Sequence, residues 1–524
     1  MSRLTLAARA AFLSLSLLAT LPAAAAAGAK SDSGVAWLAA AGDADVDKAF
    51  AQARTEKKPV LLYWGAKWCP PCNQLKATLF NRQDFIERSK GFVAVNIDGD
   101  LPGAQKLGAR FKVRGYPTLI LMGADGTELT RLPGEADAPQ VMALLQQGLA
   151  GGRPVKAVLA DARAGKPLGA NEWRALALYS WDTDQDQLVP EAERPGLLAE
   201  LSAACPATEA ESGTRLLLKS LAASDDGKGL KPDNAVRERV RKLLADPVAS
   251  RAQMEMLVNY APDITRALAP DAGADRQAIA AAFDAALQRL EGDASLSRAD
   301  RLSALAARVD LARVDLAKSE RHPKISAALL KQVREHAARA DREITDGYER
   351  QAVITGAAYM LGQAGLWQDS DALLKANLAR SHSPYYLMSQ LAGNARKLGR
   401  KDEALRWYQQ AFDKSEGPAT RLQWGATYFT ALVELAPQDA ARIEKTAAQL
   451  FREAAQDKGA FYERSARSLQ KVGSQLASWN AGGRHGAVLA RLQQQLDGVC
   501  SRIEATDSQR GTCDALARSL ARRA

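Results

Sequence analysis

The fold of this chain is decided by five consecutive residues, Trp68-Cys69-Pro70-Pro71-Cys72. They follow a short, continuous apolar run at residues 60–64, the pattern of a buried central strand. Apolar residues at helical spacing begin shortly after them, at Leu75. Cys69 is therefore expected at the N-terminus of a helix, where free backbone N–H groups and the positive end of the helix dipole stabilise a thiolate. Cys72 lies one helical turn further on, within reach of a disulfide bond.

Two cysteines in this arrangement can exchange a dithiol for a disulfide, so Cys69 and Cys72 are the predicted catalytic residues. The thiolate of Cys69 attacks a substrate disulfide, and Cys72 then breaks the mixed disulfide; the reverse sequence donates the disulfide. A zinc site is an alternative, because a Cys-x-x-Cys pair can supply half of its ligands. The other cysteines lie far off, and the four histidines are scattered without ligand spacing. We therefore expect no metal and no cofactor, with zinc, or copper bound by the two thiolates, as the alternatives.

Helix and strand signals alternate on both sides of this motif, from about residue 36 to residue 150. Further strands are expected at residues 92–97, 118–122 and 128–132, and further helices at residues 104–111 and 139–150. Asp125-Gly126, between the last two strands, supplies the positive φ angles of a tight hairpin turn. The βαβαββα order predicts an α/β domain, a mixed sheet with helices on both faces.

A second motif, Gly115-Tyr116-Pro117-Thr118, places Pro117 45 residues after Cys72. Together the two motifs resemble the active site and the cis-proline loop of the thioredoxin superfamily, and the resemblance covers residues 36–150. It implies a thioredoxin fold in which Cys69 is the nucleophile and Cys72 the resolving thiol. It also implies supporting roles for Trp68 as an aromatic cover, Tyr116 in substrate contact, and Pro117 as the cis-proline that faces the disulfide.

The sequence departs from that family at two positions and carries a distinctive dipeptide. Tyr63 stands where many thioredoxins keep a buried acid, and Ala94 stands where they keep a lysine. Water and a carboxylate such as Glu56 are thus both candidates for the group that accepts the proton of the resolving thiol. Pro70-Pro71 has no backbone N–H, which removes one donor to the Cys69 thiolate. A less stabilised thiolate favours the disulfide, so we expect a reductase or isomerase rather than a strong oxidant.

The first 27 residues are typical of a secretory signal peptide. Arg3 and Arg9 precede an apolar run at residues 10–21, and small residues suited to cleavage follow it. A membrane anchor is the alternative, but the run is shorter than the roughly 20 residues that a bilayer needs. We expect a periplasmic or secreted chain with no transmembrane segment after cleavage. The net charge of +10 comes from interleaved basic and acidic residues, so we expect no nucleic-acid partner.

After Gly151-Gly152 the alternation ends, and apolar residues three and four apart continue to the C-terminus. We expect a linker at residues 151–170, an all-helical region at residues 171–350 and a tetratricopeptide-like helical region at residues 351–524. The last expectation depends on a 34-residue period, which relates Gly365 to Gly399 and Pro384 to Pro418. Other stacked helix pairs are the alternative, and both predict an elongated array with a concave binding face.

Three cysteines remain outside the motif. Cys500 and Cys513 bracket a polar loop, and we expect a structural disulfide between them rather than a second redox pair. Cys205 is expected to be a buried free thiol, with intermolecular pairing as the alternative. The acidic stretch at residues 182–193 resembles a calcium loop incompletely, because Gln187 replaces the glycine that such a loop needs. An acidic turn that ends a helix is the favoured interpretation of that stretch.

The sequence thus predicts an exported thiol–disulfide oxidoreductase. Its expected partners are exported proteins that carry thiols or disulfides, selected by the helical array, and an electron donor in the membrane is a further candidate. The alternative is a redox-inactive adaptor or chaperone-like scaffold, which uses its thioredoxin-like domain only for docking.

Overall fold

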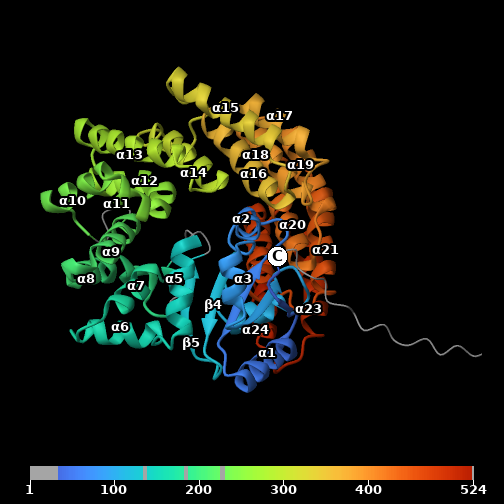
Figure 1. The fold of residues 1–524 in the computed structure, drawn as a ribbon. Coiled ribbons are helices and arrows are strands. Elements are labelled where there is room, and N and C mark those ends of the chain that lie inside the picture. Colours follow the sequence, from blue (N-terminus) through green and yellow to red (C-terminus); the bar gives the residue numbers. More distant parts are fainter. Residues whose placement is uncertain (1–33, 134–137, 182–183, 185–186, 225–229, 522–524) are drawn as a thin grey trace, which may run out of the picture.

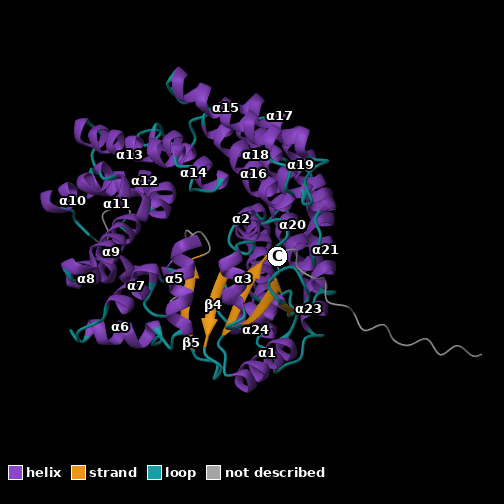
Figure 2. Ribbon diagram, viewed as in Figure 1, coloured by secondary structure: helices purple, strands orange, loops and turns teal. Residues whose placement is uncertain are grey.

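The chain folds into an N-terminal domain that contains a sheet and a large region made of helices (Figure 1). The computed structural model describes residues 34–133, 138–181, 184, 187–224 and 230–521. The signal peptide expected at residues 1–27 lies outside these residues. Within the described residues, all the strands belong to the N-terminal domain (Figure 2).

A five-stranded sheet in the order β1-β3-β2-β4-β5 forms the centre of this domain. The central strand β2 (Val60–Gly65) is buried along its whole length, which explains its continuous apolar run. It runs parallel to β3 (Val93–Asp98) and antiparallel to β4 (Thr118–Met122). At the edges, β5 (Glu128–Pro133) pairs antiparallel with β4, and the short β1 (Leu38–Ala39), which the sequence did not predict, pairs with β3.

Helices cover both faces of the sheet, as the strand and helix order predicts. Alternate residues of a strand point to opposite faces, so Leu62 and Trp64 enter one core while Leu61 and Tyr63 enter the other. The first core is covered by α1 (Asp43–Glu56) and α4 (Ala104–Arg110). The second is covered by α2 (Pro70–Ala77), α3 (Gln83–Ser89) and α5 (Ala138–Leu149). The fold is therefore a thioredoxin-like mixed sheet with flanking helices.

The second core continues without a break into the helical region. The next helix, α6 (Val155–Arg163), carries Val155, Val158 and Leu159 at helical spacing, and all three are buried in the same core as Leu61. The expectation of a linker at residues 151–170 is therefore wrong. This stretch contains a helix with a buried apolar side, which a linker does not have.

The rest of the described chain is helical up to Ala521. Its α-helices are α7 (Ala170–Leu178), α8 (Arg194–Ala204), α9 (Ala210–Ala223), α10 (Asn234–Ala245), α11 (Pro247–Ala252), α12 (Met254–Leu268), α13 (Ala274–Gly292), α14 (Arg298–Leu311), α15 (Ala327–Glu343), α16 (Gly347–Gln363), α17 (Trp367–Asn377), α18 (Pro384–Lys397), α19 (Lys401–Lys414), α20 (Pro418–Leu435), α21 (Ala440–Ala454), α22 (Glu463–Trp479), α23 (Gly486–Cys500) and α24 (Gln509–Ala521). Two short 3₁₀ helices, Glu191–Glu193 and Ala207–Glu209, precede α8 and α9.

The 34-residue period corresponds to the successive helix pairs α16–α17 and α18–α19. Gly365 (φ 79°) and Gly399 (φ 75°) lie in the turns inside these pairs, in a conformation that glycine adopts without steric cost. Pro384 and Pro418 begin the following helices, where the missing N–H leaves no intrahelical bond unmade.

The helical region curves back onto the N-terminal domain. In Figure 1 the helices lead away from α5 through α8 to α13 and return through α14 to α24. The return packs α16 against α2 and α22 against α4. None of the helices in the described ranges is long and apolar enough to cross a membrane.

Candidate active site

Cys69 and Cys72 form a disulfide bond at the point where β2 leads into α2. Cys69 is the N-cap residue of α2, and its Sγ accepts a hydrogen bond of 3.3 Å from the backbone N–H of Cys72. Pro70 and Pro71 occupy the first two helical positions, where they leave no intrahelical bond unmade. Because neither proline carries an N–H, Cys72 supplies the backbone donor to Cys69 from the first turn of this helix.

The loop before β4 lies directly against the disulfide. The Tyr116-Pro117 peptide bond is cis, and the carbonyl oxygen of Tyr116 lies 3.6 Å from Cys69 Sγ. Thr118 begins β4 and donates a hydrogen bond of 2.8 Å to the carbonyl oxygen of Gly115, which closes the loop. The structure thus brings together all the residues that the sequence assigns to the redox centre: Trp68, Cys69, Pro70, Pro71, Cys72, Tyr116 and Pro117.

The disulfide is buried beneath side chains from the helical region. Cys69 is 2% exposed and Cys72 is 0% exposed, so no face of the disulfide is open to a large partner in this conformation. Side chains from α16, α18, α20 and α22 bond to or pack on the residues around the disulfide. We call five of them the helical cover: Gln351, Tyr386, Thr420, Trp424 and Arg464.

Trp68 receives most of these contacts. Its indole Nε1 donates a hydrogen bond of 2.9 Å to Thr420 Oγ1. Its ring stacks on Tyr386, with centroids 5.9 Å apart, and meets Trp424 edge-on. Gln351 donates a hydrogen bond of 3.1 Å to the Trp68 carbonyl oxygen. The residue expected to shield the disulfide is therefore itself enclosed by the helical cover.

Arg464 is the charged member of the helical cover. Its guanidinium group forms an ion pair with Asp100, and both side chains are largely buried. The same group lies over the rings of Trp68 and Tyr116, at 5.4 and 5.1 Å from their centroids. The backbone N–H of Arg464 donates to Gln105 Oε1 at 2.9 Å, and Gln105 Nε2 donates to the Tyr116 hydroxyl at 3.1 Å. Arg464 thus bridges the two loops that flank the disulfide.

Further bonds hold the start of α2 from the other side. His382 Nε2 lies 3.0 Å from the Lys67 carbonyl oxygen, and burial lowers the pKa of His382, so the neutral ring donates this hydrogen bond. Lys67 also forms an exposed ion pair of 3.2 Å with Glu416. On α2 itself, Gln74 Nε2 donates a hydrogen bond of 2.7 Å to Asp300 Oδ1 on α14.

The buried position usually held by an acid is occupied by a phenol. The Tyr63 hydroxyl is buried without a hydrogen-bond partner among the described residues, and burial raises the pKa of Tyr63. A carboxylate enters from the neighbouring strand instead, because Asp98 ends β3 opposite Gly65, the last residue of β2. Burial raises the pKa of Asp98 and lowers the pKa of Lys76 on α2, while the attraction between the two charges opposes both shifts.

Asp98 is a functional candidate that the sequence did not single out. A signal for it existed, because polar residues at the ends of neighbouring parallel strands share one edge of a sheet. Glu56, the carboxylate considered from the sequence, lies at the end of α1, beyond the opposite end of β2. It is exposed and forms an ion pair of 2.7 Å with Lys58.

The other predicted sites lie apart from the redox centre. Cys500 and Cys513 form a disulfide that joins α23 to α24, and Cys205 forms no disulfide and is half-buried. Two acidic residues of the calcium-like stretch, Asp182 and Asp186, lie outside the described residues, while Asp184 is buried and accepts a hydrogen bond from the Tyr179 hydroxyl. No group of three or more His, Cys, Asp or Glu residues in the described chain is arranged to hold a metal ion.

Comparison with known proteins finds similarity in the N-terminal domain. The profile of a family described as a thioredoxin-like domain matches residues 46–149. The thiol:disulfide interchange protein DsbD 2 of Pseudomonas aeruginosa is 33% identical over 107 residues, which is 20% of this chain and 18% of that protein. DsbD of Pseudomonas fluorescens is 33% identical over 99 residues, 18% of this chain and 17% of that protein. A thioredoxin from Thermus thermophilus, solved in solution, is 23% identical with a TM-score of 0.21, covering 23% of this chain and 90% of its own.

Residues 46–149 therefore form a thioredoxin-like domain, and it is joined to a large helical region. The chain spans less than a fifth of the length of the two interchange proteins. The similarity to them is thus confined to this domain.

Proposed function

We propose that this chain is an exported thiol–disulfide oxidoreductase that acts on protein clients in the periplasm or outside the cell. The observation that carries the proposal is the Cys69–Cys72 disulfide at the N-terminus of α2, with the Tyr116 carbonyl against Cys69 Sγ. The similarity of this domain to thiol:disulfide interchange proteins supports the same chemistry.

In the reducing direction, Cys69 acts first. Its thiolate accepts the Cys72 N–H at the helix N-terminus and attacks one sulfur of the client disulfide, whose other sulfur leaves as a thiolate. Cys72 then loses its proton and attacks Cys69 Sγ, which releases the second client thiolate and forms the Cys69–Cys72 disulfide. Two electrons pass to the client, and Asp98 is the half-buried carboxylate that we assign as the acceptor of the Cys72 proton.

The proposed direction is reduction or isomerisation. A thiolate at a helix N-cap can accept N–H groups from the second and third helical positions, and Pro71 removes the first of these donors. A less stabilised thiolate makes the dithiol a better reductant. An external donor must then reduce the disulfide again, and a membrane protein is the proposed source of these electrons.

The helical cover gives the helical region a role in this reaction. It lies on the face that a client must reach, so a client or an electron donor must displace it before exchange begins. Selection of partners by the helical region would follow directly from that requirement.

The burial of the disulfide also favours the second candidate, a redox-inactive scaffold whose thioredoxin-like domain serves only for docking. Reduction of insulin by the full chain separates the two functions. We expect turnover by the wild type, none by Cys69→Ser, and unchanged turnover by Cys205→Ser, which removes a thiol outside the site. Equal inactivity of the wild type and Cys69→Ser would favour the scaffold.

The clients can be identified with Cys72→Ala, in which the mixed disulfide on Cys69 has no resolving thiol. We expect client proteins from the cell envelope to accumulate on this variant and to be released by dithiothreitol. The double variant Cys69→Ser Cys72→Ala is the matched control, and clients trapped equally on it would contradict the proposed chemistry.

A further inference from the structure

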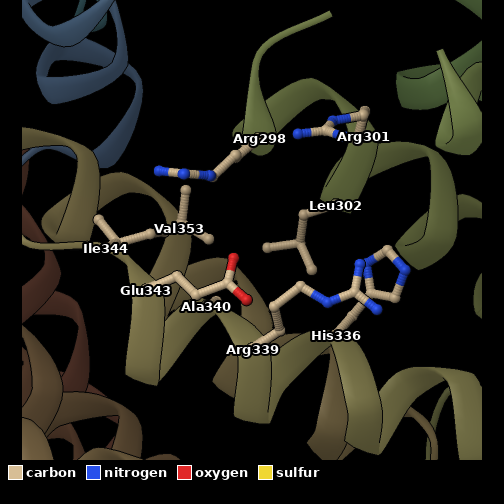
Figure 3. Close-up of a pocket in the computed structure, with 9 residues that line it drawn as sticks. All are labelled: Arg298, Arg301, Leu302, His336, Arg339, Ala340, Glu343, Ile344 and Val353. Atoms are coloured by element: carbon tan, nitrogen blue, oxygen red, sulfur yellow. The ribbon is translucent and has the colours of Figure 1, made fainter. Parts of the chain in front are cut away.

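A cavity of about 210 Å³ opens between α14, α15 and α16 in the helical region (Figure 3). Leu302, Ile344 and Val353 supply its apolar wall and are themselves buried. Figure 3 shows charged side chains that face one another across the cavity, from α14 on one side and α15 on the other. These are Arg298, Arg301, His336, Arg339 and Glu343.

Two of the charged groups already have partners outside the cavity. Arg298 forms an ion pair of 3.1 Å with Glu349 at the start of α16. His336 Nε2 lies 3.1 Å from Glu291, which also pairs with Arg308. These contacts fix the rim of the cavity without filling it.

Two guanidinium groups are left without a partner. Arg301 and Arg339 form no hydrogen bond or ion pair with the residues that the structure describes; Arg339 is exposed, whereas Arg301 is half-buried and its Nε is fully buried. A buried N–H of a charged group without an acceptor is costly, so an acceptor is expected there. Glu343 also lines the cavity with its carboxylate, but this carboxylate lies beyond ion-pair distance of both Arg301 and Arg339. The cavity therefore keeps an excess of positive charge.

We propose that this cavity binds a small organic anion through a carboxylate or phosphate group. The planar guanidinium group of arginine matches both groups with two parallel hydrogen bonds, and Arg301 and Arg339 approach from opposite walls. The apolar wall accommodates a short carbon chain. The volume lies below the ~300 Å³ at which pockets for drug-sized ligands begin, which restricts the ligand to a small molecule.

The cavity belongs to the part of the helical region that holds the redox helix. Asp300, next to Arg301 on α14, accepts the hydrogen bond from Gln74 on α2. On α16, Gln351 lies two residues before Val353 and donates to the Trp68 carbonyl oxygen. Binding at the cavity is nevertheless a property of the helical region and does not depend on thiol chemistry.

Calorimetric titration of the full chain with inorganic phosphate and, separately, with succinate tests the proposal at constant ionic strength. Binding of either anion supports the site, and the two arms distinguish phosphate from carboxylate as the preferred group. We expect Arg301→Gln and Arg339→Gln each to weaken binding at least about tenfold, because each removes a charge-assisted hydrogen-bonding group. Glu343→Gln should bind more tightly, since it removes a negative charge that repels the ligand.

Arg342→Gln is the matched control, because Arg342 is exposed on α15, carries the same charge and does not line the cavity. Its affinity should equal that of the wild type. Absence of heat with both anions, or an equal loss in Arg342→Gln, would overturn the proposal. The tightening in Glu343→Gln cannot arise from damage to the fold, so it keeps the test decisive if an arginine variant unfolds.

Discussion

At the residue scale, Arg464 provides the counter-charge for Asp100 within the redox centre. In Arg464→Gln the buried carboxylate of Asp100 loses its ion-pair partner, which we expect to cost about 3 kcal/mol of stability. The unbalanced negative charge should also disfavour the Cys69 thiolate. The rate of alkylation of the reduced protein by iodoacetamide should therefore rise at a higher pH than in the wild type.

A second substitution checks this explanation. Asp100→Asn combined with Arg464→Gln removes both charges, so the pH dependence of alkylation should return towards that of the wild type. If the double variant is shifted as far as Arg464→Gln alone, then the effect comes from loosened packing rather than from charge.

Asp98 yields a prediction with a defined sign. Because burial raises the pKa of Asp98, the folded state binds this proton more tightly than the unfolded state, and stability is lost as the pH rises through the raised pKa. Asp98→Asn should thus be more stable than the wild type at pH 7 and approach it in acid, below the ordinary pKa of an aspartate. Urea unfolding at several pH values measures this difference, and a gap that does not change with pH would contradict it.

The same variant tests the proposed role of Asp98 in catalysis. Without a proton acceptor, release of the trapped client by Cys72 should slow, while the first attack by Cys69 is unaffected. Stopped-flow measurement of the two steps separates them, and equal slowing of both would argue against a role in proton transfer.

The residues of the motif could be predicted because each carries a local signal. The cysteines follow an apolar run, and Pro117 follows an aromatic residue before the next strand. Arg464 carries no such signal, because it meets Asp100 across 364 residues of sequence. Nothing near Arg464 distinguishes it from the many exposed arginines of the chain.

At the scale of elements, the two prolines in the first turn of α2 are expected to affect the Cys69 thiolate differently. The backbone N–H of the second helical position can reach the N-cap side chain, whereas that of the first position cannot. Pro71→Ala should therefore add a donor to the Cys69 thiolate, and Pro70→Ala should not. A hydrogen bond to a charged group is worth about 1.5 kcal/mol or more, so the reduction potential of Pro71→Ala should rise by roughly 30 mV.

Equilibration of the two variants with glutathione measures this difference, and Pro70→Ala serves as the matched control. An equal shift in both variants would mean that helix strain, rather than the restored donor, sets the potential.

The Cys500–Cys513 disulfide should stabilise the last two helices. It closes a loop of 13 residues, for which chain entropy gives about 3 kcal/mol. In Cys500→Ser Cys513→Ser we expect faster hydrogen exchange in α23 and α24, with little change in α2 and the sheet. Loss of protection throughout the molecule would show that these helices support the whole fold.

Most elements of the N-terminal domain could be predicted because each spans several residues of consistent pattern. β1 could not, since its two residues become a strand only by pairing with β3. The helix α6 was missed for a different reason. Glycines and a proline precede it, and its nine residues are too few to outweigh that signal of a break.

At the scale of the whole molecule, the sequence predicts two kinds of architecture in the correct order but not how they meet. The contacts of the helical cover join residues that are 283 (Gln351 and Trp68) to 396 (Arg464 and Trp68) positions apart. Such contacts depend on how each successive helix pair is oriented, and small differences in angle accumulate along the array. The sequence pattern of a single helix pair therefore does not predict where the later helices lie relative to the N-terminal domain.

The enclosed position of Cys69 has a kinetic consequence for the reduced protein. If alkylation requires a prior opening of the helical cover, the rate should first rise with iodoacetamide concentration and then level off at the opening rate. Trp424→Ala, which removes one ring from the helical cover, should raise that limit. A rate that stays proportional to reagent in both proteins would mean that small molecules reach Cys69 without any opening. A plateau would mean that small thiols in solution cannot exchange with the dithiol while the helical cover is closed. The dithiol would then pass its electrons only to partners that open the helical cover.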